Sequence, residues 1–332
     1  MRTPLENRTS PVAVWKEEDV IDGRRVRAFV AILRTTGCWW SREQGCTMCG
    51  YNLASEERIG LQDLRAQLDK VLASYSGEEM IKIYNSGSFL DSREIPLEFR
   101  QDILDGFEGA GRILFETRPE FVTEEALDEF PSGRISVAIG LESKSDAVLK
   151  NCIRKGFTVE QYVAAAELLG RKRIPLRTYL LLKPPFLTER QSIEDSKRSV
   201  SFASKFSESV SINPVNVQKG TLVEELWRRG DYRPPWLWSL IEVLKTGKEC
   251  SGTRVFSSPS GGGTPRGVHD CGKCDRKVLE AIQRFTFSQD QSEFNQTQCE
   301  CMVEWRALIE VQDVMNASVD ADRYLSSELE LE

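Results

Sequence analysis

The sequence predicts an α/β fold, a partial (β/α)6 barrel followed by a small C-terminal appendage. Six apolar segments alternate with segments whose apolar residues recur at helical intervals. Strands that alternate with helices pair in parallel through right-handed crossovers. A doubly wound sheet has the same alternation, and the pattern hardly separates the two architectures. Composition changes after about residue 247, so we expect a lead-in over 1–24, a barrel over 25–246 and an appendage over 247–332.

The predicted strands are 26–33, 79–85, 112–116, 134–142, 176–182 and 209–217. The predicted helices are 61–75, 95–107, a short segment after Thr123, 145–151, 158–169, 188–206 and 222–229. Pro96 suits the first turn of its helix, and Thr123 is a typical helix-capping residue. The stretch 257–267 is rich in Ser, Gly and Pro and predicts a loop, and 318–332 predicts a helix or a frayed tail.

Composition is that of a soluble globular protein, with 40% hydrophobic and 29% charged residues among 332. No apolar run is long enough for a membrane span, and the N-terminus lacks a signal-peptide core, so we expect no membrane association and a cytoplasmic location. Nine cysteines in a reducing compartment favour metal binding over disulfides. The net charge of −7 does not indicate a nucleic-acid-binding protein by itself.

Three cysteines, Cys38, Cys46 and Cys49, follow the first predicted strand with the spacing Cys-x7-Cys-x2-Cys. Three thiolates leave one iron of a [4Fe–4S] cluster without a protein ligand. That iron can hold a small chelating molecule, such as the amino and carboxylate groups of S-adenosylmethionine (SAM). A zinc knuckle or unpaired thiols are the alternatives, although no His lies near to complete a zinc site.

Carboxylates end two apolar strands, at Glu116 and Glu142. A buried carboxylate needs a partner, and the ribose hydroxyls of SAM can donate to one. Arg118 and Arg154 are candidates to grip the carboxylate of the methionine moiety, since a guanidinium does so bidentately. A structural ion pair, such as Arg118 with Glu142, is the alternative.

The cysteine loop resembles that of the radical-SAM superfamily, although the usual spacing there is Cys-x3-Cys-x2-Cys. The resemblance implies that Tyr51 packs on the adenine of SAM. It also implies that Ser86, Gly87 and Ser88, after the second strand, bind the methionine amino group. The usual Gly-Gly-Glu is absent at that position, and a simple turn is the alternative.

Longer motifs resemble two related families. Residues 116–120, 140–150 and 154–158 are similar to the radical-SAM half of the Elongator catalytic subunit. The segments 38–40, 46–51, 86–91, 213–218 and 233–239 resemble the archaeosine-biosynthesis radical-SAM family, RaSEA, and the resemblance covers about 25–305.

That resemblance implies archaeosine formation at position 15 in the D-arm of tRNA. A lysine-transferring partner, similar to a tRNA-guanine transglycosylase, first attaches lysine to the 7-cyano group of the modified base. The radical-SAM lyase then breaks the lysine Cε–N bond and leaves a formamidine. Lys183, Asn213, Asn216 and Gln218 follow the last strands and could orient the adduct, or they could be polar rim residues without substrate contact.

Four further cysteines, Cys271, Cys274, Cys299 and Cys301, lie in the appendage and have the composition of a structural Zn²⁺ site. His269 could replace one of them. A second iron–sulfur cluster is the other metal option, because spacing alone does not exclude it.

Two other functions remain open at the level of sequence. One is sulfur insertion into tRNA, which needs an auxiliary cluster, and the other is a non-catalytic zinc- and thiol-rich module that binds nucleic acid. Binding of the polyanionic tRNA is expected to use a local basic face, which the sequence suggests at Arg24, Arg25, Arg27, Arg171, Lys172 and Arg173.

Overall fold

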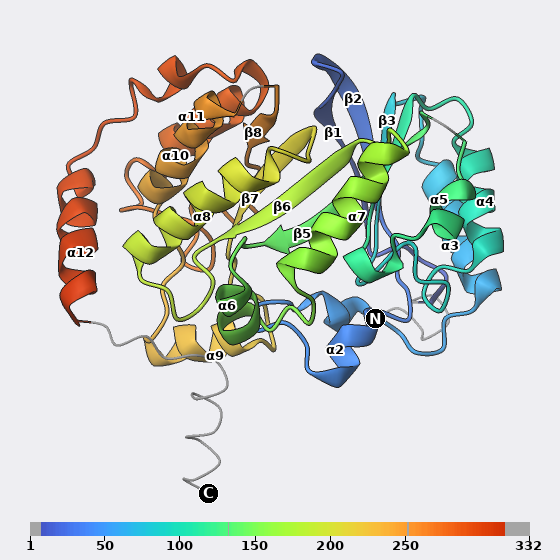
Figure 1. Ribbon diagram of the computed structural model, residues 1–332, viewed down its shortest axis with the longest axis horizontal. Helices are drawn as coiled ribbons and strands as arrows, with labels where there is room; N and C mark the ends of the chain where they lie inside the picture. Colours follow the sequence, from blue (N-terminus) through green and yellow to red (C-terminus); the bar gives the residue numbers. More distant parts are fainter. Residues whose placement is uncertain (1–7, 132, 251, 316–332) are drawn as a thin grey trace, which may run out of the picture. The chain divides into compact units, whose positions relative to one another are not determined.

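The computed structural model describes residues 8–131, 133–250 and 252–315, and the predicted tail at 318–332 lies outside them (Figure 1). Its strands are β1 (Ala13–Ile21), β2 (Arg24–Ile32), β3 (Met80–Tyr84), β4 (Arg112–Glu116), β5 (Ile135–Glu142), β6 (Leu176–Leu182), β7 (Ser209–Pro214) and β8 (Arg254–Phe256). They follow one another along the sheet in sequence order. A doubly wound sheet reverses its strand order, so the predicted α/β class with barrel-type strand order is confirmed.

The helices of more than one turn are α2 (Trp39–Glu43), α3 (Leu61–Leu72), α4 (Leu97–Gly106), α5 (Glu124–Asp128), α7 (Val159–Arg171), α8 (Glu189–Ala203), α9 (Leu222–Arg229), α10 (Leu237–Lys245), α11 (Asp275–Ser288) and α12 (Cys301–Met315). The shorter α6 (Asp146–Val148) runs into the π-helix η3 (Leu149–Ile153). The remaining short turns are η1 (Tyr51–Ala54), η2 (Pro119–Phe121), η4 (Thr246–Glu249) and η5 (Gln291–Phe294).

The described chain forms two compact units. The first comprises residues 8–43, 51–140 and 161–176, and the second comprises 44–50, 141–160 and 177–315. This division follows spatial contacts. The boundaries at about residues 24 and 246 rest on composition and stay a prediction.

The first unit is built on β2, β3, β4 and most of β5, which pair in parallel. Phe29, Val30 and Ala31 of β2 are fully buried, because a parallel strand is covered on both faces. Tyr75 and Phe107 pack edge to face with ring centroids 5.1 Å apart, and both rings contact Phe29. This aromatic cluster fixes the strand that leads into the first cysteine.

The predicted lead-in contains a strand, β1, which pairs antiparallel with β2. Asp22 and Gly23 join the two strands with φ of 50° and 76°. Asp-Gly with positive φ at both positions is typical of a tight hairpin turn, so this dipeptide is the sequence signal for the hairpin.

The second unit contains β6, β7 and β8, which are also parallel. A capping box of Thr188 and Gln191 starts α8. The buried face of α8 is rich in serine: Ser196 donates to the Leu181 carbonyl oxygen at 3.0 Å, and Ser192 accepts from the Lys183 amide at 2.6 Å. These bonds tie α8 to the end of β6. Strand β8 was not among the strands predicted from the sequence.

Among the residues that the structure describes, no helix is both long and apolar enough to cross a bilayer.

Candidate functional site

The cysteine loop begins in the first unit, where β2 ends. Gly37, with φ of 89°, precedes Cys38, and the Cys38 carbonyl oxygen accepts from the hydroxyl of Ser41 at 2.7 Å. Helix α2 occupies five of the seven residues between Cys38 and Cys46. The long first gap of the cysteine motif is therefore a helical turn inserted into the loop.

Cys46 and Cys49 lie in the second unit, and the Cys49 amide donates to the Cys46 carbonyl oxygen at 3.2 Å. Thr47 anchors the turn between them. Its hydroxyl donates to the Cys152 carbonyl oxygen at 2.7 Å, and its amide donates to the Ile153 carbonyl oxygen at 3.0 Å. The end of η3 thereby fixes this part of the loop.

Gly50 provides the second anchor. Its amide donates to Oε1 of Gln218 at 2.6 Å. A Cβ at Gly50 would lie 2.8 Å from the Lys219 carbonyl oxygen, so only glycine permits this approach. Gln218, which the sequence suggested as a substrate residue, holds the cysteine loop in the structure.

Replacing Gln218 with alanine should loosen residues 44–50. The variant leaves the Gly50 amide without its acceptor, at a cost of about 1–3 kcal/mol if water does not replace it. Faster hydrogen exchange of residues 44–50 and less iron after reconstitution are the expected results. Gln218→Glu keeps an acceptor oxygen and should restore both. Gln101→Ala removes an exposed glutamine of α4 and serves as the control. Unchanged exchange in Gln218→Ala would contradict the anchoring role.

Gly87 follows β3 and packs against the cysteine loop within the first unit. A Cβ there would lie 2.7 Å from Cα of Cys38 and 2.1 Å from Oε2 of Glu94. Glu94 is 3% exposed and accepts from the Ser88 amide at 2.7 Å and from the Thr35 hydroxyl at 2.5 Å. Burial raises the pKa of Glu94 above its usual value, and these hydrogen bonds only partly oppose that shift. Glu94, which no sequence motif indicated, joins the end of β3 to the cysteine loop.

Ser86 and Tyr51 also meet in the first unit. The Ser86 hydroxyl donates to the Tyr51 carbonyl oxygen at 3.1 Å. The Tyr51 side chain is 59% exposed, so its ring lies outside the core. The predicted adenine-stacking residue thus lies beside the predicted amino-binding turn.

Arg118 lies beside the tryptophans of α2. Its guanidinium is 5.5 Å from the ring centroid of Trp39, and its Nε donates to Oε1 of Glu120 at 2.5 Å. The same carboxylate oxygen accepts from the indole of Trp39 at 3.1 Å. The Arg118 amide donates to the Ser88 hydroxyl at 3.1 Å. Glu116 is half-buried at the end of β4, two residues before Arg118.

Strained backbone marks the strand ends of the second unit. Glu142 ends β5 with φ of 68°, Arg154 caps η3 with φ of 56°, and Lys183 follows β6 with φ of 61°. A left-handed conformation costs a residue with a side chain roughly 1–2 kcal/mol, and such residues cluster at functional sites. π-helical turns such as η3 are also frequent there.

A lysine pairs with the carboxylate that ends β5 in the second unit. Glu142, only 7% exposed, accepts from Lys155 Nζ at 2.6 Å. In the first unit, Arg118 pairs with Glu120, as described above. Lys155 was not among the predicted residues, although it lies in the motif 154–158.

Lys183 is held by a buried carboxylate. Its Nζ lies 2.6 Å from Oε2 of Glu189, which is 1% exposed. The Lys183 carbonyl oxygen accepts from the buried hydroxyl of Tyr232 at 2.7 Å. Of the two asparagines, Asn213 accepts from the Ser211 hydroxyl at 3.0 Å, and Asn216 lies against the loop at Gly261.

The four cysteines of the appendage converge. Cys274 precedes α11, and Cys301 begins α12. The sulfur separations are 3.7 Å for Cys271–Cys274, 3.8 Å for Cys271–Cys299 and 3.6 Å for Cys274–Cys301. All four sulfurs lie within 4.8 Å of one another.

His269 is not part of this thiol group: its Nδ1 lies 2.7 Å from the Gly267 carbonyl oxygen. Burial raises the pKa of the Cys274 and Cys301 thiols. Burial has the same effect at Cys271, but hydrogen bonds from the amides of Lys273 and Cys274 outweigh it and lower the Cys271 pKa to about 7.

Hydrogen bonds from two consecutive residues, Trp238 and Ser239, connect this cysteine group to the residues that hold Lys183. The indole of Trp238 donates to Sγ of Cys301 at 3.3 Å. The next residue, Ser239, accepts from the indole of Trp305 at 2.9 Å and donates to Oε1 of Glu189 at 2.5 Å. Glu189 in turn binds Lys183, so the appendage supports the end of β6.

Three of the six residues of the suggested basic face are paired with carboxylates. Within the first unit, Arg24 lies 2.7 Å from Glu79, Arg25 binds Glu18, and Lys172 binds Asp128. These partners offset the positive charge that a phosphate backbone would need.

Comparison with known proteins identifies relatives across nearly the whole chain. Archaeosine synthase subunit beta of Methanosarcina acetivorans is 40% identical over 314 residues, which cover 91% of each chain. That of Thermococcus kodakarensis is 38% identical over 311 residues, which cover 89% of this chain and 96% of the relative. An N-terminally truncated Elp3 of Methanocaldococcus infernus is a similar solved structure, with 19% identity and a TM-score of 0.48, covering 69% of this chain and 58% of that one. No family model matches the sequence.

Proposed function

Because the chain belongs to the archaeosine synthase subunit beta family, we propose that it is a radical-SAM enzyme that modifies tRNA during archaeosine formation. The observation that carries this proposal is 40% identity to such a subunit over 91% of both chains. The cysteine loop after β2, with its anchors at Thr47 and Gly50, supplies the matching chemistry.

The substrate in this proposal is the lysine adduct of a 7-deazaguanine at position 15 of tRNA, and the bond that breaks is the lysine Cε–N bond. A partner subunit, similar to a tRNA-guanine transglycosylase, attaches the lysine beforehand. With SAM bound, the cluster supplies a carbon radical able to take hydrogen from an unactivated C–H. The protein must hold the Cε–H close to that radical and exclude water.

Cys38, Cys46 and Cys49 would hold the [4Fe–4S] cluster, since three thiolates leave one iron open to SAM. Tyr51 would stack on the adenine, which its exposed ring permits. Residues 86–88 would bind the methionine amino group beside Cys38. Arg118 would meet the methionine carboxylate, because its buried guanidinium lies beside the tryptophans of α2.

Glu142 and Glu116 would accept from the ribose hydroxyls, and Arg154 would contribute a second cation. The strained backbone at Glu142 and Arg154 supports a ligand-binding role, because strain persists where function requires it. Asn213, Asn216 and Gln218 would face the substrate side, with Gln218 also holding the loop. Lys183 would act there as a fixed charge oriented by Glu189.

Glu142 permits a test that separates backbone strain from ligand binding. Glu142→Ala and Glu142→Gly both lose the bond to Lys155, but glycine adopts a φ of 68° without the steric cost that a Cβ brings. The glycine variant should be the more stable by about 1 kcal/mol in denaturant unfolding. Both variants should bind SAM more weakly, by roughly 1.5–3 kcal/mol for a lost charge-assisted bond.

Glu160→Ala, which changes an exposed carboxylate at the start of α7, is the control for this pair and should leave SAM affinity unchanged. Native SAM affinity in both Glu142 variants, measured by calorimetry, would remove Glu142 from the proposed site.

We further propose that the appendage binds zinc through Cys271, Cys274, Cys299 and Cys301. A tetrahedral ion with Zn–S bonds of about 2.3 Å puts its sulfurs about 3.8 Å apart. The separations of 3.6–3.8 Å fit one ion. A four-iron cluster distributes its thiolates over different irons, which requires wider spacing. This favours zinc over the auxiliary cluster of a sulfur-inserting enzyme.

The deciding experiment is mass spectrometry of the modified base. The protein is incubated anaerobically with SAM, a reductant and tRNA that bears the lysine adduct. SAM-dependent conversion of the adduct to the formamidine of archaeosine is expected. Conversion of adduct-free tRNA at the same rate would refute the lysine-adduct mechanism. A sulfur-containing base would favour sulfur insertion, and tRNA binding without any SAM turnover would favour a non-catalytic module.

A further inference from the structure

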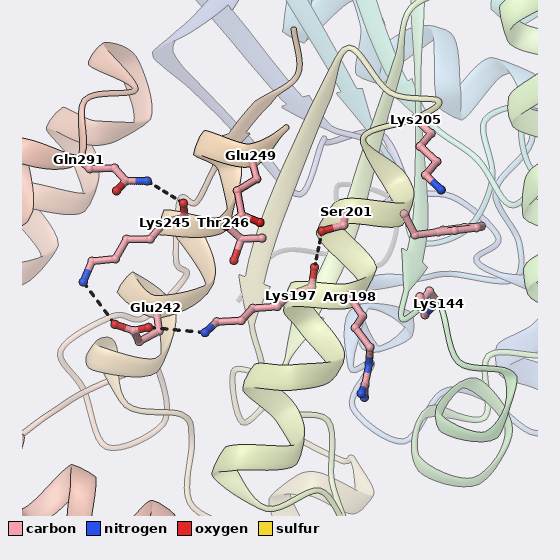
Figure 2. Close-up of a pocket in the computed structure, with 11 residues that line it drawn as sticks. Lys144, Lys197, Arg198, Ser201, Lys205, Glu242, Lys245, Thr246, Glu249 and Gln291 are labelled. Carbon is pink, nitrogen blue, oxygen red and sulfur yellow. Dashed lines mark hydrogen bonds and ion pairs between the residues drawn. The ribbon is translucent and has the colours of Figure 1, made fainter. Parts of the chain in front are cut away.

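A concave basic surface lies within the second unit, between α8 and the segment α10–η4 (Figure 2). We call it the α8 groove, and its volume is about 640 Å³. Five cationic side chains line it: Lys144, Lys197, Arg198, Lys205 and Lys245. None of them belongs to the basic face suggested by the sequence or to the proposed SAM site.

The α8 groove has an excess of positive charge in an acidic protein. Its lining contains two carboxylates, Glu242 and Glu249, against five cations, while the whole chain carries −7. Glu242 lies 3.6 Å from Lys197 and 3.3 Å from Lys245, so a single carboxylate serves two ammonium groups. Burial raises the pKa of Asp195, while a hydrogen bond from Ser143 and the charges of Arg198 and Lys144 favour its ionised form.

The cations stand on a well-anchored scaffold. Helix α8 buries its serine face and turns Lys197, Arg198 and Ser201 outward, with Lys205 just beyond its end. The amide of Lys144 donates to the Ser199 hydroxyl at 2.9 Å. The charges are therefore presented by a rigid helix and a pinned strand end, which lowers the entropic cost of ligand binding.

The lining indicates what kind of partner fits. Phe202 is the only apolar side chain among the eleven residues that line the groove. A protein interface has an apolar or aromatic core, which this surface lacks. Dispersed lysines and an arginine, with the hydroxyls of Ser201 and Thr246 as further donors, are typical of phosphate contacts.

We propose that the α8 groove binds the sugar–phosphate backbone of RNA. This inference rests on the proposed function, because it takes tRNA as the substrate and adds where its backbone docks. Contacts of this kind position a nucleic acid without reading its bases. The groove would thus hold the tRNA through its backbone, independently of the base that is modified.

The test compares two triple variants of the full chain. Lys144→Ala/Arg198→Ala/Lys205→Ala removes three groove cations, and Arg24→Ala/Arg25→Ala/Lys172→Ala removes three cations already paired with carboxylates in the first unit. The probe is an unmodified tRNA transcript, and its dissociation constant is measured over a KCl series. Unchanged circular dichroism and iron content confirm that each variant folds.

The groove variant should bind tRNA roughly 10- to 100-fold more weakly near physiological salt. A plot of the logarithm of its binding constant against the logarithm of the KCl concentration should be less steep, by about 2–3 in slope. The control variant should change affinity by only about twofold, because exposed ion pairs already neutralise those cations. Glu249→Lys adds a cation to the groove and should strengthen binding.

Native tRNA affinity in the groove variant would overturn the proposal. So would native tRNA affinity together with lost binding to the lysine-transferring subunit, which would make the groove a protein interface. The experiment can refute the groove proposal and the proposed function independently of each other. Groove-dependent tRNA binding without archaeosine formation refutes only the function, and archaeosine formation with groove-independent binding refutes only the groove.

Discussion

Cys46→Ala is expected to reduce the iron of the reconstituted protein to background and to abolish SAM cleavage, while zinc remains bound. In the proposed site, each of the three loop thiolates would bind a different iron, so losing one would leave a second iron open and the cluster unstable. Cys38→Ala and Cys49→Ala should behave alike. Iron and zinc are measured per chain, and SAM cleavage is followed by chromatography of its adenosyl product.

Cys250→Ala is the matched control for the loop variants. Cys250 is half-buried, interacts with the Thr246 carbonyl oxygen at 3.7 Å and belongs to neither cysteine group. Its replacement should leave both metals in place. A full four-iron signal in the triple variant that lacks Cys38, Cys46 and Cys49 would show that these cysteines do not hold the cluster.

Cys301→Ala is expected to release zinc and to destabilise the second unit without removing the iron cluster. Structural zinc contributes about 10 kcal/mol or more in small zinc-binding peptides, so several kcal/mol should be lost here. Cys301 is 4% exposed and accepts from Trp238, so tryptophan fluorescence should change as well. Hydrogen exchange should increase near Lys183, because Ser239 and Glu189 connect it to the appendage.

Cys152→Ala is the control for the appendage, since Cys152 is also buried but lies outside the cysteine groups. It should retain zinc and most of the stability. If Cys301→Ala loses iron in place of zinc, the appendage holds an auxiliary cluster, and the sulfur-insertion hypothesis gains support.

The sequence by itself was enough for the elements whose signals are local. Strands β4 and β6 begin and end where the sequence predicts, because each is a short apolar run between turn residues. The carboxylates at 116 and 142 end their strands as predicted. Sequence also predicted the α/β class, since alternation of the two periodicities is visible along the chain.

Other features needed the tertiary structure. Gln218 meets Gly50 across 168 positions of sequence, so no window of residues could indicate that Gln218 holds the cysteine loop. The pairing of Glu142 with Lys155 depends on the turn that η3 makes. The pairing of Arg24 and Lys172 with acidic neighbours also depends on which surfaces meet.

The four cysteines of the appendage show both what the sequence predicts and what the tertiary structure alone decides. Their residue type already predicted a metal site, because thiolates are soft ligands whatever their position. Whether they suit one ion or a cluster is a question of separation, and only folding brings Cys274 and Cys301 to 3.6 Å. Ligand chemistry belongs to the residue and can be predicted from sequence. Distance arises from packing between segments far apart in the chain, and only the tertiary structure decided it.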